Sequence, residues 1–319
     1  MRALRIAELT GADGLRLETL PDPTPGDGAL LDVKAVGIGY STLLRSIGKY
    51  QDRWEPPYTL DGEVAGVVIA APAGSGWGTG ERVAAPSAEG AAAERVVVPA
   101  GALLRIPDDL SFAQAACLRN LETALFALDV RGRVKDGETV LVHGAAGGSG
   151  IATLQIARAL GCRTIAIVSS DDKAKLAAEA GADHVLRADT GWKDETLRLT
   201  DGAGVDAVFD PVGGETMLDT IRSLREGGRW IIFGFTGGIP AIPANRVMLR
   251  NIDVVGAYRT DYFRRHPETV RAIDRRLIAL IEEGKVRPIV GTRFPFDRGA
   301  DALRSIAARE SVGQVVLEP

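Results

Sequence analysis

Cysteine, aromatic residues and long apolar runs are all scarce in this sequence of 319 residues. Only Cys117 and Cys162 are present, too few for a disulfide framework or a zinc knuckle, so we expect two buried thiols in a reducing compartment, the cytoplasm. No apolar stretch is long enough to span a bilayer, and no apolar core typical of a secretion signal follows the first arginine. We therefore expect no membrane partner.

Charge of one sign is not concentrated anywhere in the chain. The 38 basic and 42 acidic side chains give a net charge of −4 without long runs of lysine or arginine. Nucleic-acid binding and attachment to an anionic membrane surface both depend on concentrated positive charge. We therefore expect neither partner, and a small molecule becomes the expected ligand. The length favours two domains over one.

The sequence changes character near residue 115. Before it, short β-rich runs alternate with proline- and glycine-rich turns, which predicts a compact all-β unit. These runs are residues 30–39, 63–71, 82–86 and 92–100. After it, strand-like and helix-like segments alternate, which predicts right-handed βαβ units and an α/β fold with a doubly wound parallel sheet. The strand-like segments are residues 139–143, 164–168, 183–187, 205–210, 229–234 and 252–256.

The last part of the chain follows a different pattern. A charged helix is predicted from Asp261 onward, over the stretch RRHPETVRAIDRRLIALIEEG. A short extended piece, a second helix near DALRSIAARE and a terminal strand at GQVVLEP follow.

A glycine-rich loop follows the first strand of the second half. Gly144, Gly147 and Gly150 are spaced as G-x-x-G-x-x-G, just before a helix that starts near Ser149. Glycines there allow the backbone to approach a pyrophosphate closely, and the helix N-terminus offers open N–H groups to the anion. The spacing departs from the strict G-x-G-x-x-G fingerprint, but the preceding strand and the following helix favour a dinucleotide site.

The end of the next strand indicates which dinucleotide binds. An NAD site places an acidic residue there to accept a hydrogen bond from the ribose 2′-hydroxyl, whereas this sequence has Ser169 and Ser170, followed by Lys173. Two hydroxyls and a cation suit a 2′-phosphate, so the sequence predicts NADPH. Asp171 and Asp172 oppose this prediction, and we assign them to the first turn of the next helix, where acidic residues interact well with the helix dipole.

Over nearly its whole length the sequence resembles the zinc-independent quinone oxidoreductases of the medium-chain dehydrogenase/reductase superfamily. The resemblance rests on the order and spacing of seven stretches: VGIGYSTLLRSIGKY (36–50), GEVAGVV (62–68), GERV (80–83), HGAAGGSG (143–150), FDPVGG (209–214), FGFTGG (233–238) and ESVGQVVL (310–317). It implies a GroES-like β-barrel catalytic domain at residues 1–114, completed by 259–319, a Rossmann NADPH-binding domain at residues 115–258, and a homodimer joined at the last Rossmann strand.

The resemblance also assigns cofactor contacts by position. The pyrophosphate would lie against Ala146, Gly147, Gly148 and Ser149. The ribose and nicotinamide would contact Val212, Phe233, Gly234, Phe235 and Thr236, with Thr123 near the carboxamide and Arg309 near the adenine-side phosphate.

Zinc ligands are missing at the positions where zinc-dependent relatives carry them. Gly39 stands in place of a cysteine, and Asp61-Gly62-Glu63 stands in place of Gly-His-Glu. We do not expect any of the three histidines to be a ligand; they are His143, His184 and His266. The sequence therefore predicts hydride transfer without a metal, to an electrophilic small molecule.

Without zinc, negative charge on the acceptor oxygen must be met by hydroxyls, backbone N–H groups or water. Tyr50 occupies the tyrosine of the G-x-Y stretch that quinone reductases share with enoyl-thioester reductases. In this family resemblance the tyrosine is a substrate contact and, in the enoyl-thioester reductases, a proposed proton donor or orienter. It is therefore the leading catalytic candidate, ahead of Tyr40 and Thr42. A packing role for Tyr50 is the alternative.

The sequence departs from the family at several polar positions. The usual N-x-x-D has become Gly39-Tyr40-Ser41-Thr42, a tyrosine near the adenine-side phosphate has become Ala188, and P-G-x-E has become L-D-G-E. These changes leave the acceptor open between a quinone and an α,β-unsaturated carbonyl.

Two other functions remain open from the sequence. An enoyl-CoA or acyl-carrier enoyl reductase would need a basic channel, for which Arg45, Lys49 and Arg53 could form the mouth or merely lie in solvent. The second alternative is a non-catalytic NADPH-binding sensor or structural protein, since the missing Asn and Asp could mean lost acceptor chemistry.

Overall fold

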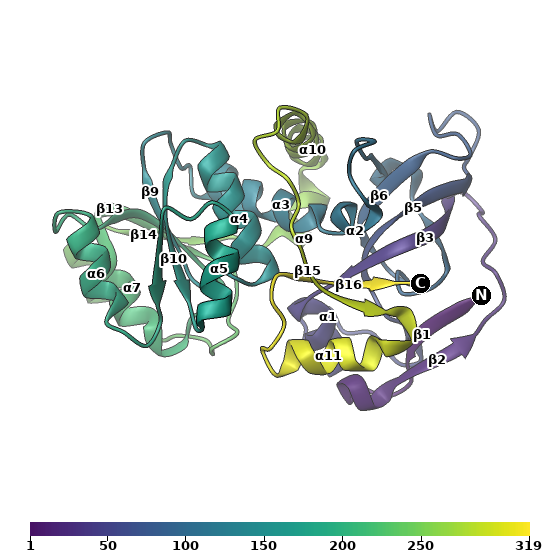
Figure 1. Cartoon of the computed structure of the whole chain (residues 1–319), viewed down its shortest axis with the longest axis horizontal. Helices are drawn as coiled ribbons and strands as arrows, with labels where there is room; N and C mark the ends of the chain where they lie inside the picture. Colours follow the sequence, from purple (N-terminus) through teal and green to yellow (C-terminus); the bar gives the residue numbers. More distant parts are fainter. The chain divides into compact units, whose positions relative to one another are not determined.

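The computed structural model describes the backbone of residues 1–319 and all side chains except those of residues 86–88. It divides into two compact units, the first formed by residues 1–119 with 288–319 and the second by residues 120–287 (Figure 1). Within the described side chains and backbone, no helix is both long and apolar enough to cross a membrane.

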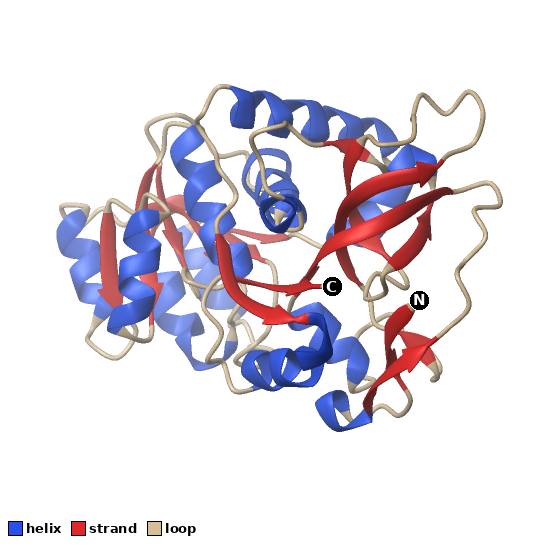
Figure 2. Ribbon diagram, turned by 45° about the vertical axis from the view of Figure 1, so that its right-hand side comes forward, coloured by secondary structure: helices blue, strands red, loops and turns tan.

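The first unit is built on β-strands and is closed by the C-terminal segment. A three-stranded sheet has the order β2-β1-β4, and a larger seven-stranded sheet has the order β15-β16-β3-β5-β6-β8, with β7 also paired to β3. Figure 2 draws the strands in red. The strands are β1 (Arg2–Ile6), β2 (Leu15–Thr19), β3 (Ala29–Ile38), β4 (Tyr58–Thr59), β5 (Gly62–Ala70), β6 (Arg82–Ala88), β7 (Arg95–Val98), β8 (Leu104–Arg105), β15 (Val290–Pro295) and β16 (Gln314–Glu318).

Residues from both ends of the chain form the core of this unit. Strand β16 pairs antiparallel with β3, so that Val316 lies opposite Gly37. Phe296, Leu303 and Leu317 belong to the same buried cluster as Leu4 and Leu31 of the N-terminal part. The short helices are α1 (Tyr40–Ser46), α2 (Phe112–Ala115) and α11 (Gly299–Ala307), with single 3₁₀ turns η1 (Gly11–Gly14), η2 (Ala100–Ala102) and η5 (Phe296–Arg298).

The second unit contains a six-stranded parallel sheet in the order β11-β10-β9-β12-β13-β14. This is the doubly wound order in which strand succession reverses beside the first strand, here β9. The strands are β9 (Thr139–Val142), β10 (Arg163–Val168), β11 (His184–Arg187), β12 (Val205–Asp210), β13 (Leu224–Ile232) and β14 (Asp253–Gly256). The predicted α/β fold class is confirmed: the second unit contains a Rossmann-type parallel sheet, and the first unit is rich in β-strands.

Helices cover both faces of the parallel sheet. Helices α4 (Gly148–Ala159) and α5 (Asp171–Glu179) lie on one face, and α6 (Trp192–Leu199) and α7 (Met217–Ser223) lie on the other (Figure 1). The remaining elements are α3 (Leu118–Leu125), the π-helical turn η3 (Phe126–Arg131), the 3₁₀ turn η4 (Gly214–Thr216), α8 (Ala244–Arg250), α9 (Arg259–Arg265) and α10 (Pro267–Glu282). Burial on both faces explains why β9 is apolar without alternation.

The charged segment after Asp261 forms two helices rather than the one predicted. Helix α9 ends at Arg265, and α10 begins at Pro267 after His266 takes a non-helical conformation. Proline has no N–H and disfavours a helical conformation at the preceding residue, so Pro267 begins a new helix instead of continuing the old one.

The unit boundaries differ from the expected domain boundaries of 1–114, 115–258 and 259–319. Residues 259–287 belong to the second unit because α9 packs against the segment just before the parallel sheet. Phe126 contacts the rings of Tyr262 and Phe263, with centroids 5.0 and 5.2 Å apart, and Arg259 pairs with the buried Glu122 at 2.8 Å.

Candidate cofactor site

The glycine-rich loop lies at the carboxyl end of the central strand β9, where open α/β sheets bind ligands. The backbone N–H groups at the start of the loop donate to neighbouring strands. The His143 amide donates to the Phe209 carbonyl at 3.0 Å, and the Ala145 amide donates to the Ile167 carbonyl at 3.2 Å. The loop turns through Gly144, which has a φ of +57°. Strands on both sides of β9 therefore hold the loop in place.

Gly150 sits where helix α4 passes closest to this loop. A Cβ at this position would lie 2.3 Å from the Gly144 carbonyl oxygen and 2.6 Å from the Ala145 Cα, so only glycine fits. The first intrahelical hydrogen bond of α4 runs from the Ile151 amide to the Gly147 carbonyl at 2.9 Å. The amides of Gly148, Ser149 and Gly150 consequently form the open N-terminus of the helix, which is the arrangement that binds phosphate.

Ser169, Ser170 and Lys173 come together at the end of β10. The Lys173 Nζ donates to the Ser169 Oγ at 3.1 Å, and the Ser170 Oγ caps α5 by accepting from the Lys173 amide at 3.4 Å. The sequence predicted this group, and the structure places two hydroxyls and an ammonium at one strand end.

Arg187 lies beside this group and was not predicted. It is the last residue of β11 and is paired in register with Val168, the residue just before Ser169. Its Nη1 donates to the Asp171 Oδ1 at 2.5 Å and its Nη2 to the Asp189 Oδ2 at 3.1 Å. The hydrogen bond to Asp171 raises the pKa of Arg187 above its ordinary value. The signal in the sequence was a basic residue at the carboxyl end of a parallel strand.

Asp210 holds two further loops that carry predicted cofactor contacts, and it was not itself predicted. This residue is 1% exposed, and its Oδ1 accepts from the amides of Val212 and Gly213 at 2.8 and 2.9 Å. Its backbone carbonyl accepts from the Phe233 amide at 2.9 Å. A buried acid ending a strand in the stretch FDPVGG was the available signal.

The two loops that Asp210 holds, residues 211–213 and 233–236, lie against each other and against the glycine-rich loop. Thr236 donates its amide to the Pro211 carbonyl at 3.1 Å. The Val212 side chain lies close to Gly144, since a Cβ atom added to that glycine would be 3.5 Å from the Val212 Cγ2. The structure therefore brings Val212 and the segment Phe233, Gly234, Phe235 and Thr236 to the same edge of the sheet as the loop containing Ala146 and Gly147. Thr123 is buried in α3 of the same unit.

The catalytic candidates belong to the first unit. Tyr50 is half-buried, and its ring centroid lies 4.6 Å from the Arg45 Cζ. Tyr40 is 37% exposed at the first position of α1, whereas Thr42 is buried and accepts a hydrogen bond from the Gly39 amide at 3.4 Å. The Thr42 hydroxyl is thus already used in capping its own helix.

Arg45 is not part of an exposed basic surface. Its guanidinium pairs with Asp61, the residue is 9% exposed, and its Cζ lies 4.3 Å from the Trp54 ring centroid. Of the three basic residues considered for a channel mouth, Arg45 is therefore buried, and only Lys49 and Arg53 have appreciable exposure. Arg309 also belongs to the first unit; it follows α11 and has a φ of +58°.

The histidines are not arranged as metal ligands. His143 is buried, its Nε2 lies 2.9 Å from the Thr220 Oγ1, and its ring packs edge-on against Trp192. Burial lowers its pKa, an effect that the Asp210 carboxylate opposes. Among the residues whose side chains are described, no three His, Cys, Asp or Glu residues are grouped so that they could hold a metal ion.

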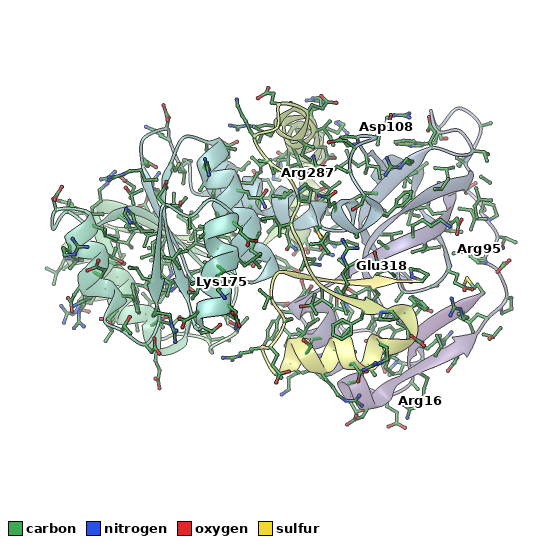
Figure 3. All side chains as sticks on the ribbon, in the orientation of Figure 1. Arg16, Arg95, Asp108, Lys175, Arg287 and Glu318 are labelled. Carbon is green, nitrogen blue, oxygen red and sulfur yellow. The ribbon has the colours of Figure 1, made fainter. Side chains whose placement is uncertain are left out.

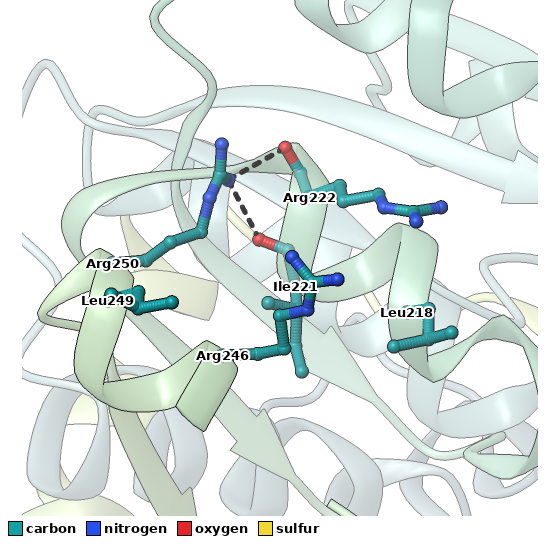
Figure 4. A pocket seen from close by; sticks show the side chains of 6 residues that line it. All are labelled: Leu218, Ile221, Arg222, Arg246, Leu249 and Arg250. Atoms are coloured by element: carbon teal, nitrogen blue, oxygen red, sulfur yellow. Dashed lines mark hydrogen bonds between the residues drawn. The ribbon is translucent and has the colours of Figure 1, made fainter. Parts of the chain in front are cut away.

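A pocket of about 220 Å³ lies between α7 and α8, lined by Leu218, Ile221, Arg222, Arg246, Leu249 and Arg250 (Figure 4). Arg250 donates to the carbonyls of Ile221 and Arg222 at 3.0 and 2.9 Å, and so holds the end of α7 against α8. The pocket shares no residue with the glycine-rich loop or with the group formed by Ser169, Ser170 and Lys173.

Both parts of the chain match known protein families. Residues 25–108 match the alcohol dehydrogenase GroES-like domain, and residues 148–275 match the zinc-binding dehydrogenase family. Quinone oxidoreductase-like protein 2 of Rattus norvegicus is 34% identical over 305 residues, which cover 94% of this chain and 87% of the relative. The chain belongs to the zinc-independent quinone oxidoreductase family.

Solved structures of quinone oxidoreductases and their relatives have the same fold. A mycobacterial protein complexed with NADPH is 34% identical, with a TM-score of 0.91 and full coverage of both chains. The quinone oxidoreductase of Thermus thermophilus, whose structures include a complex with NADPH, is 33% identical, with a TM-score of 0.87 and full coverage of both chains.

Proposed function

We propose that this quinone oxidoreductase family member is an NADPH-dependent, zinc-independent reductase that transfers a hydride to a quinone or an α,β-unsaturated carbonyl. The observation that carries the proposal is the phosphate-binding loop at the end of β9, with the Ser169, Ser170 and Lys173 group at the end of the neighbouring strand β10. The complexes of two similar proteins with NADPH support it.

The residues at this sheet edge fit NADPH. The open amides of Gly148 and Ser149 would hold the pyrophosphate, since a helix N-terminus favours an anion. Ser169, Ser170 and Lys173 would hold the 2′-phosphate by charge-assisted hydrogen bonds. Val212 and Phe233 to Thr236 would line the ribose and nicotinamide, and Asp210 fixes both loops. When bound, NADPH supplies the hydride.

In the first unit, Tyr50 would donate a hydrogen bond to the acceptor oxygen as negative charge develops on it. The flanking Arg45 guanidinium, itself fixed by Asp61, limits how the Tyr50 ring can turn. A donor held in place in this way stabilises the charge without reorganising during the reaction.

A panel of acceptors tests the proposal. The protein would be mixed with NADPH and a series of quinones, enones or enoyl-CoAs, and oxidation would be followed by loss of the dihydronicotinamide absorbance. We expect activity with quinones or enones. Exclusive use of enoyl-CoAs would replace the proposal with the enoyl-reductase alternative, and tight NADPH binding without any turnover would replace it with the non-catalytic alternative.

We further propose a homodimer joined through β14. This strand ends the parallel sheet, carries the exposed Val254 at 39%, and would gain hydrogen-bond partners by pairing with a second copy. Light scattering after size exclusion should give twice the chain mass, and Val254→Lys should shift the measured mass toward that of the monomer.

We also propose a cytoplasmic location, which is supported by the buried thiols of Cys117 and Cys162, since they are not joined in a disulfide.

A further inference from the structure

Acidic side chains lie near the predicted 2′-phosphate site and would repel the phosphate group of NADPH. Asp171 and Asp172 occupy the first turn of α5, directly after the Ser169-Ser170 pair, and Asp189 follows the end of β11. A phosphate brought beside Ser169 would be repelled by each uncompensated carboxylate. The site therefore needs something to neutralise them.

Each of these carboxylates has a basic partner. Asp172 pairs with Lys175 at 3.2 Å, and both side chains are exposed. Lys175, on α5, is labelled in Figure 3. Asp171 and Asp189 both pair with Arg187, at 2.5 and 3.1 Å. One guanidinium thus pairs with two carboxylates and offsets one of their two negative charges. Its loss would leave both carboxylates uncompensated near Ser169.

Arg187 is also suited to contact the phosphate. Each terminal nitrogen of a guanidinium carries two N–H groups, and the pairs to Asp171 and Asp189 use one on each. The side chain is 33% exposed, so the remaining donors can reach a ligand. Ala188, which follows it, carries no group that would compete for this space.

We propose that Arg187 determines specificity for the phosphorylated dinucleotide, by offsetting the negative charge of Asp171 and Asp189 and by adding a guanidinium near Lys173. The inference rests on the proposed function, because it names a residue of the same cofactor site. It would explain how this chain can accommodate a 2′-phosphate although it has an acidic residue next to the serine pair.

The test is direct titration of the full-length protein with NADPH and with NADH. Arg187→Gln should weaken NADPH binding by about tenfold or more, and should change NADH binding by less than about twofold. Adding Asp171→Asn to Arg187→Gln should recover part of the loss, since a repelling charge is removed together with its partner. Asp171→Asn alone, at an exposed position, should keep or increase the affinity for NADPH.

Two controls make the outcome specific. Arg198→Gln removes another exposed arginine, which pairs with Glu195 within α6, and should leave both affinities unchanged. Lys173→Gln reports on the proposed site itself. If wild type prefers NADPH and Lys173→Gln reduces that preference while Arg187→Gln does not, the inference is wrong and the proposed function stands. If wild type does not prefer NADPH, both fail.

Discussion

Tyr50 is the single side chain on which the proposed chemistry in the first unit depends. Its ring rests on the Arg45 guanidinium, and that guanidinium is fixed by Asp61 and Trp54. The Arg45–Asp61 pair could not be predicted from the sequence, because the two residues lie 16 positions apart. The family pattern also has an uncharged residue at the position of Asp61. What the sequence indicated was only that Tyr50 follows the G-x-Y spacing.

Replacing Tyr50 tests its proposed role as hydrogen-bond donor. Tyr50→Phe keeps the ring against Arg45 but removes the hydroxyl, so kcat should fall by about a hundredfold. The dissociation constant for NADPH should not change, since the cofactor-binding residues are untouched. Tyr258→Phe, an exposed tyrosine, is the matched control. An unchanged kcat in Tyr50→Phe would leave Tyr50 with a packing role only.

The burial of His143 predicts that the free energy of unfolding depends on pH. Its pKa is lowered by burial from the ordinary value of 6.5, so the unfolded chain takes up a proton at a higher pH than the folded protein. The stabilising contribution is complete above about pH 6.5 and is lost as the pH falls toward the lowered value in the folded state. Denaturant unfolding at several pH values should therefore show a smaller decrease for His143→Gln than for wild type. The exposed His184→Gln is the control, and equal slopes in all three proteins would contradict the assignment.

At the scale of elements, the sequence predicts the strand, loop and helix from β9 to α4 well. It only suggests the close contact between α4 and the loop at Gly150. The glycine spacing and flanking periodicity indicated strand, loop and helix. The reason for Gly150 became visible only in three dimensions, where α4 passes over the Gly144 carbonyl.

Gly150→Ala tests this contact. Alanine normally stabilises a helix relative to glycine, but here its Cβ would lie 2.3 Å from backbone that cannot move aside freely. We expect a loss of about 1–3 kcal/mol in the free energy of unfolding, and weaker binding of NADPH through a displaced helix N-terminus. Gly101→Ala is the control, because nothing lies within 4 Å of a Cβ there. A stabilised Gly150→Ala protein would show that the contact is not as tight as described.

At the scale of the whole molecule, the two units differ in how the chain builds them. The second unit is continuous, from residue 120 to 287, whereas the first is completed by residues 288–319. Local sequence patterns predicted the parallel sheet strand by strand. They could not place residues 259–287, because that assignment depends on packing of α9 against Phe126 and Glu122.

Truncation separates the two units. A fragment of residues 120–287 should fold alone and give cooperative thermal unfolding, since its sheet and core are complete. A chain ending at residue 287 should lose the first unit, because β16 and the core residues Phe296, Leu303 and Leu317 are removed. Circular dichroism and hydrogen exchange would follow both. Protected amides in β3 of the truncated chain would show that the first unit does not need its C-terminal segment.

The sequence by itself determined the fold class, the glycine-rich loop between β9 and α4, and the proximity of Ser169, Ser170 and Lys173, because these depend on local periodicity, turn glycines and residues close in the chain. Only the tertiary structure decided that Asp210 fixes two loops at once, that Arg187 neutralises Asp171, and that Arg45 lies between Tyr50 and Trp54. Each of these contacts joins residues whose proximity is set by strand order, register or the packing of separate segments. Local pattern carries no information on those distances, and the cooperative packing of the whole unit fixes them.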